Sequence, residues 1–327
     1  MGRWMAGLLC IWSLASLSQA ASFSFTTIEL PGATGTDLYG INDTGQIVGI
    51  NTAFPYQAGF QYENGMFTTL PFPGISRDIN NVGQIVGQYY TFSGNRAFLY
   101  SGGEFTLLPE SPSLSASSAL GINDAGQIVG YYVDTKTPGF LPDHGYLYSN
   151  GTLTTIDFPG ALGTVASSIN NAGQIAGTFR YPGATGYIHG FVLRNGVFSI
   201  VDEPGAVDAY PYGTLITGIN DSGELVGSLS NPSGGCAFIY QQNSFTCFSV
   251  PGALYTYPFG INNAGQIIGS YGFSASRSYG FVATPVPEPA ALMLVAGGLI
   301  ALIRIGGGRR RLTKPRTQRT VKKLGTD

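Results

Sequence analysis

A ten-residue pattern, written six times along the chain, constrains the fold more than any other feature. The copy at 121–130 reads GINDAGQIVG. Near copies are GINDTGQIVG (40–49), DINNVGQIVG (78–87), SINNAGQIAG (168–177), GINDSGELVG (218–227) and GINNAGQIIG (260–269). The Asn at the third position of these decapeptides recurs at intervals of 38, 43, 47, 50 and 42 residues. Periods in this range are typical of propellers, solenoids and repeat arrays.

Each repeat contains four strand-like runs. In the repeat that starts at Ala166 they are Ala166–Asn170, Gln174–Thr178, His189–Leu193 and Val197–Asp202. Apolar and β-branched residues alternate within these runs, and Gly, Asn or Pro bounds them. No stretch of the repeats has a helical period. The sequence therefore predicts an all-β protein.

The decapeptide has the sequence of a tight turn between two strands. Ile-Asn begins the turn, its fourth residue is Gly in every copy, and Gln/Glu-Ile/Leu starts the next strand. A type I turn followed by a left-handed glycine fits this pattern, because that position needs a positive φ. The residue after the conserved Asn is Asp43, Asp124 and Asp221 in three copies and Asn81, Asn171 and Asn263 in the others. A charged site would need the carboxylate in every copy, so we interpret the motif as shape and not as chemistry.

One repeat is split between the two ends of the body. The last repeat stops after its third strand at Ala283, whereas the strand-like run Phe25–Gly32 precedes the first decapeptide. A closed ring explains this split, because the N-terminal strand then joins the first and last repeats. The sequence predicts a six-bladed β-propeller of four-stranded blades, closed by its N-terminal strand. An open β-solenoid or repeat array is the alternative.

Both ends of the chain differ from the repeats. Residues 1–20 combine Arg3, an apolar stretch and Ser18-Gln19-Ala20, which predicts a secretory signal cleaved after Ala20. At the other end, Val286-Pro287-Glu288-Pro289 leads into an apolar run over 290–303 and then Arg309-Arg310-Arg311. Fourteen helical residues span about 21 Å, less than the roughly 30 Å hydrocarbon core. An ordinary membrane anchor oriented by its arginines is the alternative interpretation.

The order of these parts resembles a PEP-CTERM sorting tail, which has a Pro-Glu-Pro motif, a hydrophobic helix and a basic cluster. The resemblance implies export in a Gram-negative bacterium, transient anchoring in the inner membrane, and recognition and removal of the tail by an exosortase. Family tails usually end soon after the basic cluster, whereas this chain continues. The predicted segments are a signal peptide (1–20), the repeat domain (21–284), the sorting tail (285–311) and a basic extension (312–327).

The third strands resemble the HAF repeats of extracellular proteins. Two of them begin with His144-Gly145-Tyr146 and His189-Gly190-Phe191, and the others begin with Ala58, Arg96, Cys236 and Tyr279. The resemblance covers roughly residues 23–283. It implies an exported repeat protein and brings no catalytic residues with it.

The charge of the repeats argues against several classes of partner. Residues 21–284 hold six basic and sixteen acidic residues, a net charge of −10. Nucleic acid and anionic lipid are poor partners for such a surface. The two histidines, His144 and His189, have no triad or metal-ligand spacing around them, and we expect no catalytic residue, metal or cofactor. The alternative is a polysaccharide-active lyase or hydrolase that uses loop carboxylates such as Asp134, Asp143 and Asp208.

Two cysteines remain once the signal is removed. Cys236 and Cys247 fall on the third and fourth strands of one repeat. A two-residue turn at Gln242-Asn243 offsets them diagonally, so their pairing stays open. A disulfide here would be a staple of an exported protein and not a redox site.

The loops between strands suggest where a ligand binds. In a propeller, the loops from second to third strands and from fourth strands to the next blade emerge on one face, and here they are long and rich in Tyr. Exposed aromatic rings stack on sugars, and function tends to lie in such loops. We expect a non-catalytic cell-surface or matrix protein that binds exopolysaccharide or another surface glycan; a purely architectural protein is a further alternative. The candidate ligand residues are Tyr56, Tyr90, Tyr132, Tyr181, Tyr210, Tyr212, Tyr255 and Tyr257.

Overall fold

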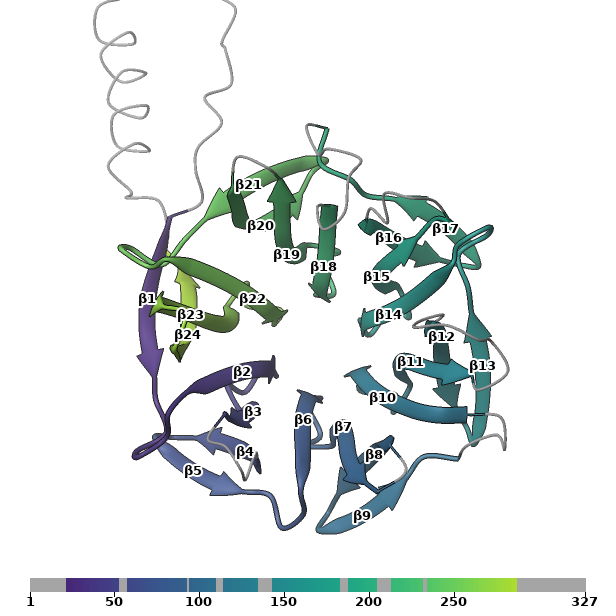
Figure 1. The fold of residues 1–327 in the computed structure, drawn as a ribbon, viewed down its shortest axis with the longest axis horizontal. Coiled ribbons are helices and arrows are strands. Elements are labelled where there is room, and N and C mark those ends of the chain that lie inside the picture. The colour runs from purple at the N-terminus through teal and green to yellow at the C-terminus, as the bar shows by residue number, and fades with distance from the viewer. Residues whose placement is uncertain are drawn as a thin grey trace, which may run out of the picture. The chain divides into compact units, whose positions relative to one another are not determined.

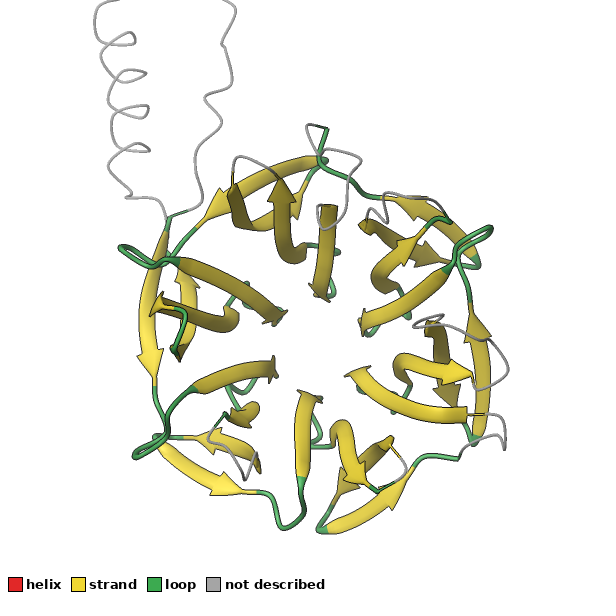
Figure 2. Ribbon diagram, viewed as in Figure 1, coloured by secondary structure: helices red, strands yellow, loops and turns green. Residues whose placement is uncertain are grey.

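The computed structural model describes residues 22–52, 58–92, 94–109, 114–134, 143–182, 188–204, 213–231 and 234–286. The chain divides into two units, Met1–Val286 and Pro287–Asp327, and all described residues belong to the first. They form strands and loops (Figure 2), which confirms the all-β prediction. Among them, no helix is long and apolar enough to cross a membrane. The predicted signal and the predicted tail helix lie outside the described residues.

The strands recur in sets of four along the chain. The first strands lie nearest the centre of the unit in Figure 1: β2 (Thr36–Ile41), β6 (Gly74–Ile79), β10 (Leu114–Ile122), β14 (Gly163–Ile169), β18 (Gly213–Ile219) and β22 (Tyr255–Ile261). The second strands are β3 (Ile47–Asn51), β7 (Ile85–Thr91), β11 (Ile128–Asp134), β15 (Ile175–Arg180), β19 (Leu225–Asn231) and β23 (Ile267–Ser274).

The third strands are β4 (Ala58–Glu63), β8 (Gly94–Ser101), β12 (Asp143–Ser149), β16 (Ile188–Arg194), β20 (Gly234–Gln241) and β24 (Arg277–Pro285). The outermost strands are β5 (Met66–Thr69), β9 (Glu104–Leu107), β13 (Thr152–Ile156), β17 (Val197–Ile200), β21 (Ser244–Phe248) and β1 (Phe23–Ile28).

Within each set the strands pair antiparallel, and in every set but the last, neighbours in sequence are neighbours in space. The set β10-β11-β12-β13 is one four-stranded sheet, and two eight-stranded sheets each consist of two sets joined by a single parallel pair. The last sheet has the order β1-β24-β23-β22, in which Phe23 lies opposite Pro285 and Ile28 opposite Gly280. The four-stranded sheets resemble propeller blades, and one of them combines the first strand of the described chain with the last three.

The decapeptide forms the predicted turn. In the first copy the Gly45 N–H donates to the Asn42 carbonyl at 3.1 Å, and the Asn42 Oδ1 accepts the Gln46 N–H at 2.9 Å. The turn glycines of all six copies have φ between +71° and +82°. The left-handed glycine is therefore confirmed, and the Asn side chain caps the backbone of its own turn.

The last glycine of the decapeptide is required for a different reason, which is the lack of space for a Cβ atom. A Cβ on Gly87 would lie 1.9 Å from the Ile75 carbonyl oxygen and 2.9 Å from the Phe98 ring. In the other five copies the equivalent Cβ would lie 2.0 to 2.2 Å from the corresponding carbonyl. Only glycine lets the first and second strands and the aromatic ring of the third strand approach this closely.

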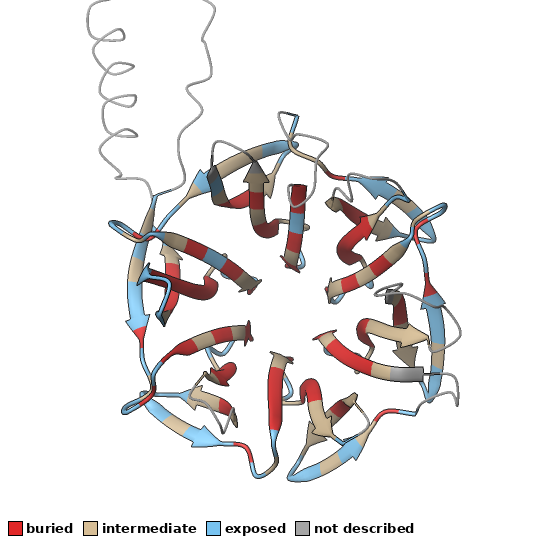
Figure 3. Ribbon diagram, in the orientation of Figure 1, coloured by how far each residue is buried: buried red, intermediate tan, exposed pale blue. Residues whose placement is uncertain are grey.

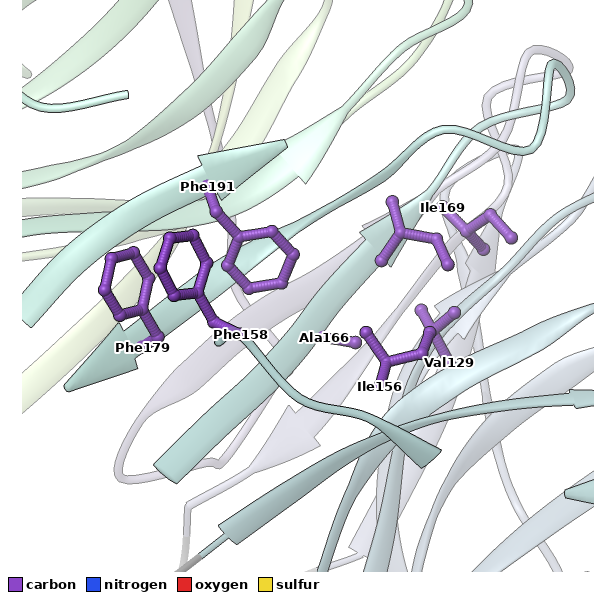
Figure 4. Packing of buried hydrophobic residues seen from close by; sticks show 8 residues of the cluster. Val129, Ile156, Phe158, Ala166, Ile169, Phe179 and Phe191 are labelled. Carbon is purple, nitrogen blue, oxygen red and sulfur yellow. The ribbon is translucent and has the colours of Figure 1, made fainter. Parts of the chain in front are cut away.

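The core lies between neighbouring sheets and is richest near the inner strands (Figure 3). The recurring aromatic residue of each third strand is less than 2 % exposed, as in Phe98, Tyr146 and Phe191. In one cluster, Val129 and Ile156 of one sheet pack with Ala166, Phe179 and other residues of the next (Figure 4). Each buried aromatic side chain contributes about 1.5–3 kcal/mol to stability. The repeats are therefore held together sheet against sheet.

Every innermost strand has a bulge at the same place. In β2 the register shifts between Leu38 and Gly40, so Tyr39 has no partner on β3. The same shift occurs at the equivalent place in all six innermost strands. A bulge redirects the side chain of the extra residue. The residues in this position are Tyr39, Arg77, Leu120, Ser167, Thr217 and Phe259.

Candidate functional site

The six decapeptide turns meet through alternating Asp and Asn side chains. The Asn81 Nδ2 donates to the Asp43 Oδ2 at 2.8 Å and to the Asp124 Oδ2 at 2.9 Å. Asn171 and Asn263 bridge their neighbouring carboxylates in the same way, at 2.8 to 3.0 Å. We call this group the Asx ring; its members in chain order are Asp43, Asn81, Asp124, Asn171, Asp221 and Asn263.

Backbone groups reinforce the Asx ring. The Asp43 N–H donates to the Asn81 Oδ1 at 2.8 Å, and the equivalent bond links each copy to the next until the Asn263 N–H donates to the Asp43 Oδ1, also at 2.8 Å. A second series starts with the Asn42 Nδ2, which donates to the Asn80 carbonyl at 3.1 Å. It ends with the Asn262 Nδ2 and the Asn42 carbonyl at 3.2 Å. The first and last copies are thus linked by the same bonds as neighbours along the chain.

The alternation has a simple chemical reason. A carboxylate only accepts hydrogen bonds, whereas a primary amide supplies two donors, so each neighbouring pair matches a donor with an acceptor. In the sequence, Asp and Asn look interchangeable at this position because both suit a turn. In space the two residue types alternate from one copy to the next. Within the described residues, no group of three or more His, Cys, Asp or Glu is placed to hold a metal ion. What the Asx ring does show is a set of hydrogen bonds that join each turn to the next.

Behind the Asx ring lies a central cavity of about 80 Å³. Bulge residues line it, and the rings of Tyr39 and Phe259 lie with their centroids 4.8 Å apart. The Arg77 guanidinium lies 4.4 Å from the centre of the Tyr39 ring. This volume is well below the roughly 300–1,000 Å³ of usual ligand sites.

One partly buried carboxyl group lines this cavity. Asp78 stands where the other copies have Gly or Ser, and its two oxygens accept the N–H groups of Ile79 and Ile122 at 2.9 Å each. Burial raises the pKa of the Asp78 carboxyl to about 7, and these two hydrogen bonds oppose the rise. Asp78 therefore changes charge close to neutral pH.

A larger groove of about 610 Å³ is lined by the sheet β18–β21 and by the start of β22. Tyr255 and Tyr257 stand on alternate residues of β22, with ring centroids 5.2 Å apart and an angle of 27° between the rings. Tyr257 is 48 % exposed and Leu254 beside it 70 %. Hydroxyl groups complete the lining, from Ser228, Ser230, Ser249 and Thr256.

Two of the eight predicted tyrosines, Tyr255 and Tyr257, line this groove together. Tyr90, Tyr132 and Tyr181 lie elsewhere. The Tyr132 ring stacks on His144, with centroids 5.1 Å apart, and Tyr181 packs edge-on against Phe179 at 5.1 Å, so each contacts its own sheet. Burial raises the pKa of Tyr90, on β7. Tyr56, Tyr210 and Tyr212 lie outside the described residues. No sequence signal distinguishes Tyr255 and Tyr257 from the other tyrosines, because the rest of the groove lining comes from the neighbouring sheet.

Cys236 and Cys247 are joined by a disulfide, with Cα atoms 5.8 Å apart, and both line the groove. In the register of β20 and β21, Cys247 lies opposite Phe238, so the cysteines are diagonal neighbours.

Of the predicted sorting motif, Val286 is described, and its N–H donates to the Ser22 carbonyl at 2.9 Å. Pro287, Glu288 and Pro289 lie outside the described residues, as do Asp208 and the Asp143 side chain, whereas Asp134 ends β11.

No protein-family model matches the chain, and neither does any curated protein. Among solved structures, the chain is similar to the β-propeller domain of the trilobed protease from Pyrococcus furiosus, with 8% identity and a TM-score of 0.43 over 77% of this chain and 94% of that one. Acylaminoacyl peptidase from Pyrococcus horikoshii gives 8% identity and a TM-score of 0.45, over 81% of this chain and 54% of that one.

A structure of YCF48 bound to D1 peptide gives 11% identity and a TM-score of 0.44, over 82% of this chain and 99% of that one. These identities and TM-scores say nothing about the ligand, partner or activity of the present chain.

Proposed function

We propose that the six four-stranded sets are the blades of a closed six-bladed propeller. Support comes from the β1–β24 pairing and from the hydrogen bonds between the first and last decapeptides, Asn263 to Asp43 and Asn262 to Asn42. In an open array these end-to-end bonds have no counterpart.

A circular permutant tests closure. The new N-terminus is placed at Gly196, in the turn between β16 and β17, and a short linker joins 286 to 22, which copies the native split of one strand from three. For a closed ring we expect one cooperative unfolding transition close to the native midpoint. A permutant that unfolds in separate steps would contradict closure.

We further propose that the protein is an exported, non-catalytic binding module for exopolysaccharide or another surface glycan, at the cell surface or in the matrix. The observation that carries this proposal is the stacked pair Tyr255 and Tyr257 in the groove of about 610 Å³. Aromatic faces stack on sugar rings, and clefts of roughly 300–1,000 Å³ are the usual size of ligand sites. The disulfide is in keeping with an oxidising compartment outside the cytosol.

The two histidines support a binding role better than an acid–base role. The His144 Nδ1 lies 2.9 Å from the Asp157 Oδ2, and the His189 Nδ1 lies 2.7 Å from the Asp202 Oδ2. Each pair joins the third strand of one sheet to the end of its own fourth strand, and each His also stacks on an aromatic ring. Equivalent pairs in two sheets fit a local structural contact, since an acid and a base that act together must converge on one substrate atom.

The proposal includes processing of the tail. We propose that an exosortase recognises the segment around Val286-Pro287-Glu288-Pro289 and releases the repeat domain, after transient anchoring through the run over 290–303. The mass of the protein recovered from the cell surface, compared with that of the full chain, tests this step. Recovery of the surface protein with residues 312–327 still attached would contradict it.

Binding is tested with the protein as the producing cell exports it. We would measure co-sedimentation with that organism's exopolysaccharide while following the length of the polymer. We expect binding at constant polymer length, weakened by Tyr257→Ala and unchanged by the matched control Tyr132→Ala. Polymer shortening would mean an active site, and absence of binding would favour an architectural protein.

A further inference from the structure

The described lining of the groove carries no charged side chain. Its residues offer aromatic and aliphatic surface from Tyr255, Tyr257, Leu215 and Leu254, and hydroxyl groups from Ser, Thr and Tyr. Leu215 and Leu254 are 39 % and 70 % exposed, so this apolar surface is accessible. Hydroxyl groups both donate and accept hydrogen bonds, which suits the hydroxyl groups of a sugar.

We propose that the groove selects a neutral saccharide segment and discriminates against polymers of uronic acids. This inference rests on the proposed glycan binding and adds the charge class of the ligand. The carboxylate of an anionic sugar would lose its hydrating water in the groove and would find no cationic side chain there. Burying a charge without a partner costs free energy. A neutral sugar meets the lining without that cost.

The surroundings of the groove point the same way. Arg277 is the cation beside Tyr255, whose hydroxyl donates to the Arg277 carbonyl at 3.3 Å, and the Arg277 guanidinium is already paired with Glu29. Asp37 is close enough to Tyr255 to raise the pKa of its hydroxyl, second to the effect of burial. The whole repeat domain has a net charge of −10. Local and long-range fields therefore both repel an anionic chain.

The arrangement of the tyrosines suits one face of a sugar ring. Alternate residues of a strand point to the same side of the sheet, so Tyr255 and Tyr257 present their rings together. Because the two rings are stacked on each other, they form one platform, whose open side is the exposed Tyr257, and not two opposed walls. The apolar face of a pyranose stacks on such a platform, while its edge meets the hydroxyl groups of the groove.

Two series of measurements test the inference with the exported protein. In the first, a panel of neutral glucans and galactans is compared with alginate and polygalacturonate of matched length, at low and at high salt. We expect at least one neutral polymer to bind at least tenfold more tightly than either uronate, with little dependence on salt. Equal or tighter binding of a uronate that weakens as salt rises would overturn the inference.

In the second series, charge is placed in the groove at an exposed position that packing does not require. Leu254→Asp and Leu254→Lys should change the affinity for the neutral polymer by the same factor, within about twofold, because a neutral ligand does not respond to the sign of the charge. If Lys strengthens binding while Asp weakens it, the ligand is anionic and the inference fails.

Failure of the proposed function looks different from failure of this inference. If no polymer binds, or if Tyr257→Ala leaves the affinity for the bound polymer unchanged, then the groove is not the glycan site. We expect Tyr257→Ala to weaken binding of the neutral polymer about tenfold, which is about 1.4 kcal/mol, because the exposed ring of the stacked pair is lost. Competition by a peptide or protein for the same groove would point to a partner of another class and overturn the proposal.

Discussion

Replacing Asn81 with Asp should destabilise the protein by breaking the alternation of the Asx ring. The Asn81 amide donates to Asp43 and Asp124 at 2.8 and 2.9 Å. In Asn81→Asp both donors are lost, and three carboxylates stand in a row. The two backbone contacts of the residue remain possible, because its N–H group is unchanged and its Oδ1 still accepts a hydrogen bond.

The size of the effect follows from these contacts. The two hydrogen bonds are exposed, so each contributes about 0.5–1.5 kcal/mol. Each new carboxylate pair at about 4 Å costs about 1 kcal/mol in a medium like water. We therefore expect a loss of about 3–5 kcal/mol at pH 7, which becomes smaller near pH 4, where protonation of the introduced Asp side chain restores a donor.

Urea unfolding at pH 7 and pH 4 measures the loss. Asn150→Asp, in the exposed turn between β12 and β13, adds the same charge away from the Asx ring and serves as the matched control. A sixfold exchange that converts every Asp of the ring to Asn and every Asn to Asp shifts the pattern by one copy. We expect it to recover most of the stability lost in Asn81→Asp, because it restores a donor beside each acceptor.

Two results would refute this account. If Asn81→Asp costs no more than Asn150→Asp, then the bridges contribute nothing measurable. If the sixfold exchange is as unstable as the single variant, then the individual positions matter and the alternation does not.

Three further predictions concern stability. Burial raises the Asp78 pKa to about 7 from 3.8, so ionisation opposes folding: stability is greatest below about pH 4 and falls as pH rises to about 7, by about 4 kcal/mol. Asp78→Ser, which copies the Ser168 contact with the next sheet, should flatten this fall in urea titrations from pH 4 to 8; an unchanged slope would mean that another group is responsible. Gly87→Ala, whose Cβ meets a carbonyl at 1.9 Å, should lower the melting temperature far more than Gly83→Ala, which has open space and costs about 1–2 kcal/mol through its φ of +80°. Equal losses would show that backbone conformation, not contact, sets the cost. The Cys236–Cys247 disulfide joins residues 11 positions apart, and its reduction should lower the free energy of unfolding by up to about 3 kcal/mol. Unfolding with and without reductant measures this loss; a much smaller loss would mean that the β20–β21 hairpin persists in the unfolded chain.

The strands and turns could be predicted because they depend on neighbouring residues. In the repeat that starts at Ala166, the predicted second and third strands, Gln174–Thr178 and His189–Leu193, overlap β15 and β16. Alternating apolar residues set those strands, and the glycine with positive φ that recurs in every copy sets the turn that leads into the second strand.

The site could be predicted only in part because it depends on which copies meet in space. The Asx ring joins residues 38 to 220 positions apart, so the order of Asp and Asn has no local meaning. The bulge residues were also missed, although a signal exists: the position before each decapeptide varies from Tyr39 to Arg77 to Leu120 within a nearly constant frame. Long loops rich in Tyr suggested the ligand residues, but the walls of the groove come from two sheets.

The residues that join one copy to the next are separate from the residues that line the groove. The decapeptides supply hydrogen bonds from each copy to the next at one end of the inner strands, and these bonds involve no residue of the groove. The groove lies near the start of β22, whereas the decapeptide turn follows the end of that strand. Substitutions such as Leu254→Lys can therefore alter recognition without disturbing the contacts that join the sheets. If the groove binds a glycan as proposed, this separation lets the variable segments carry recognition while the repeated motif keeps the copies together.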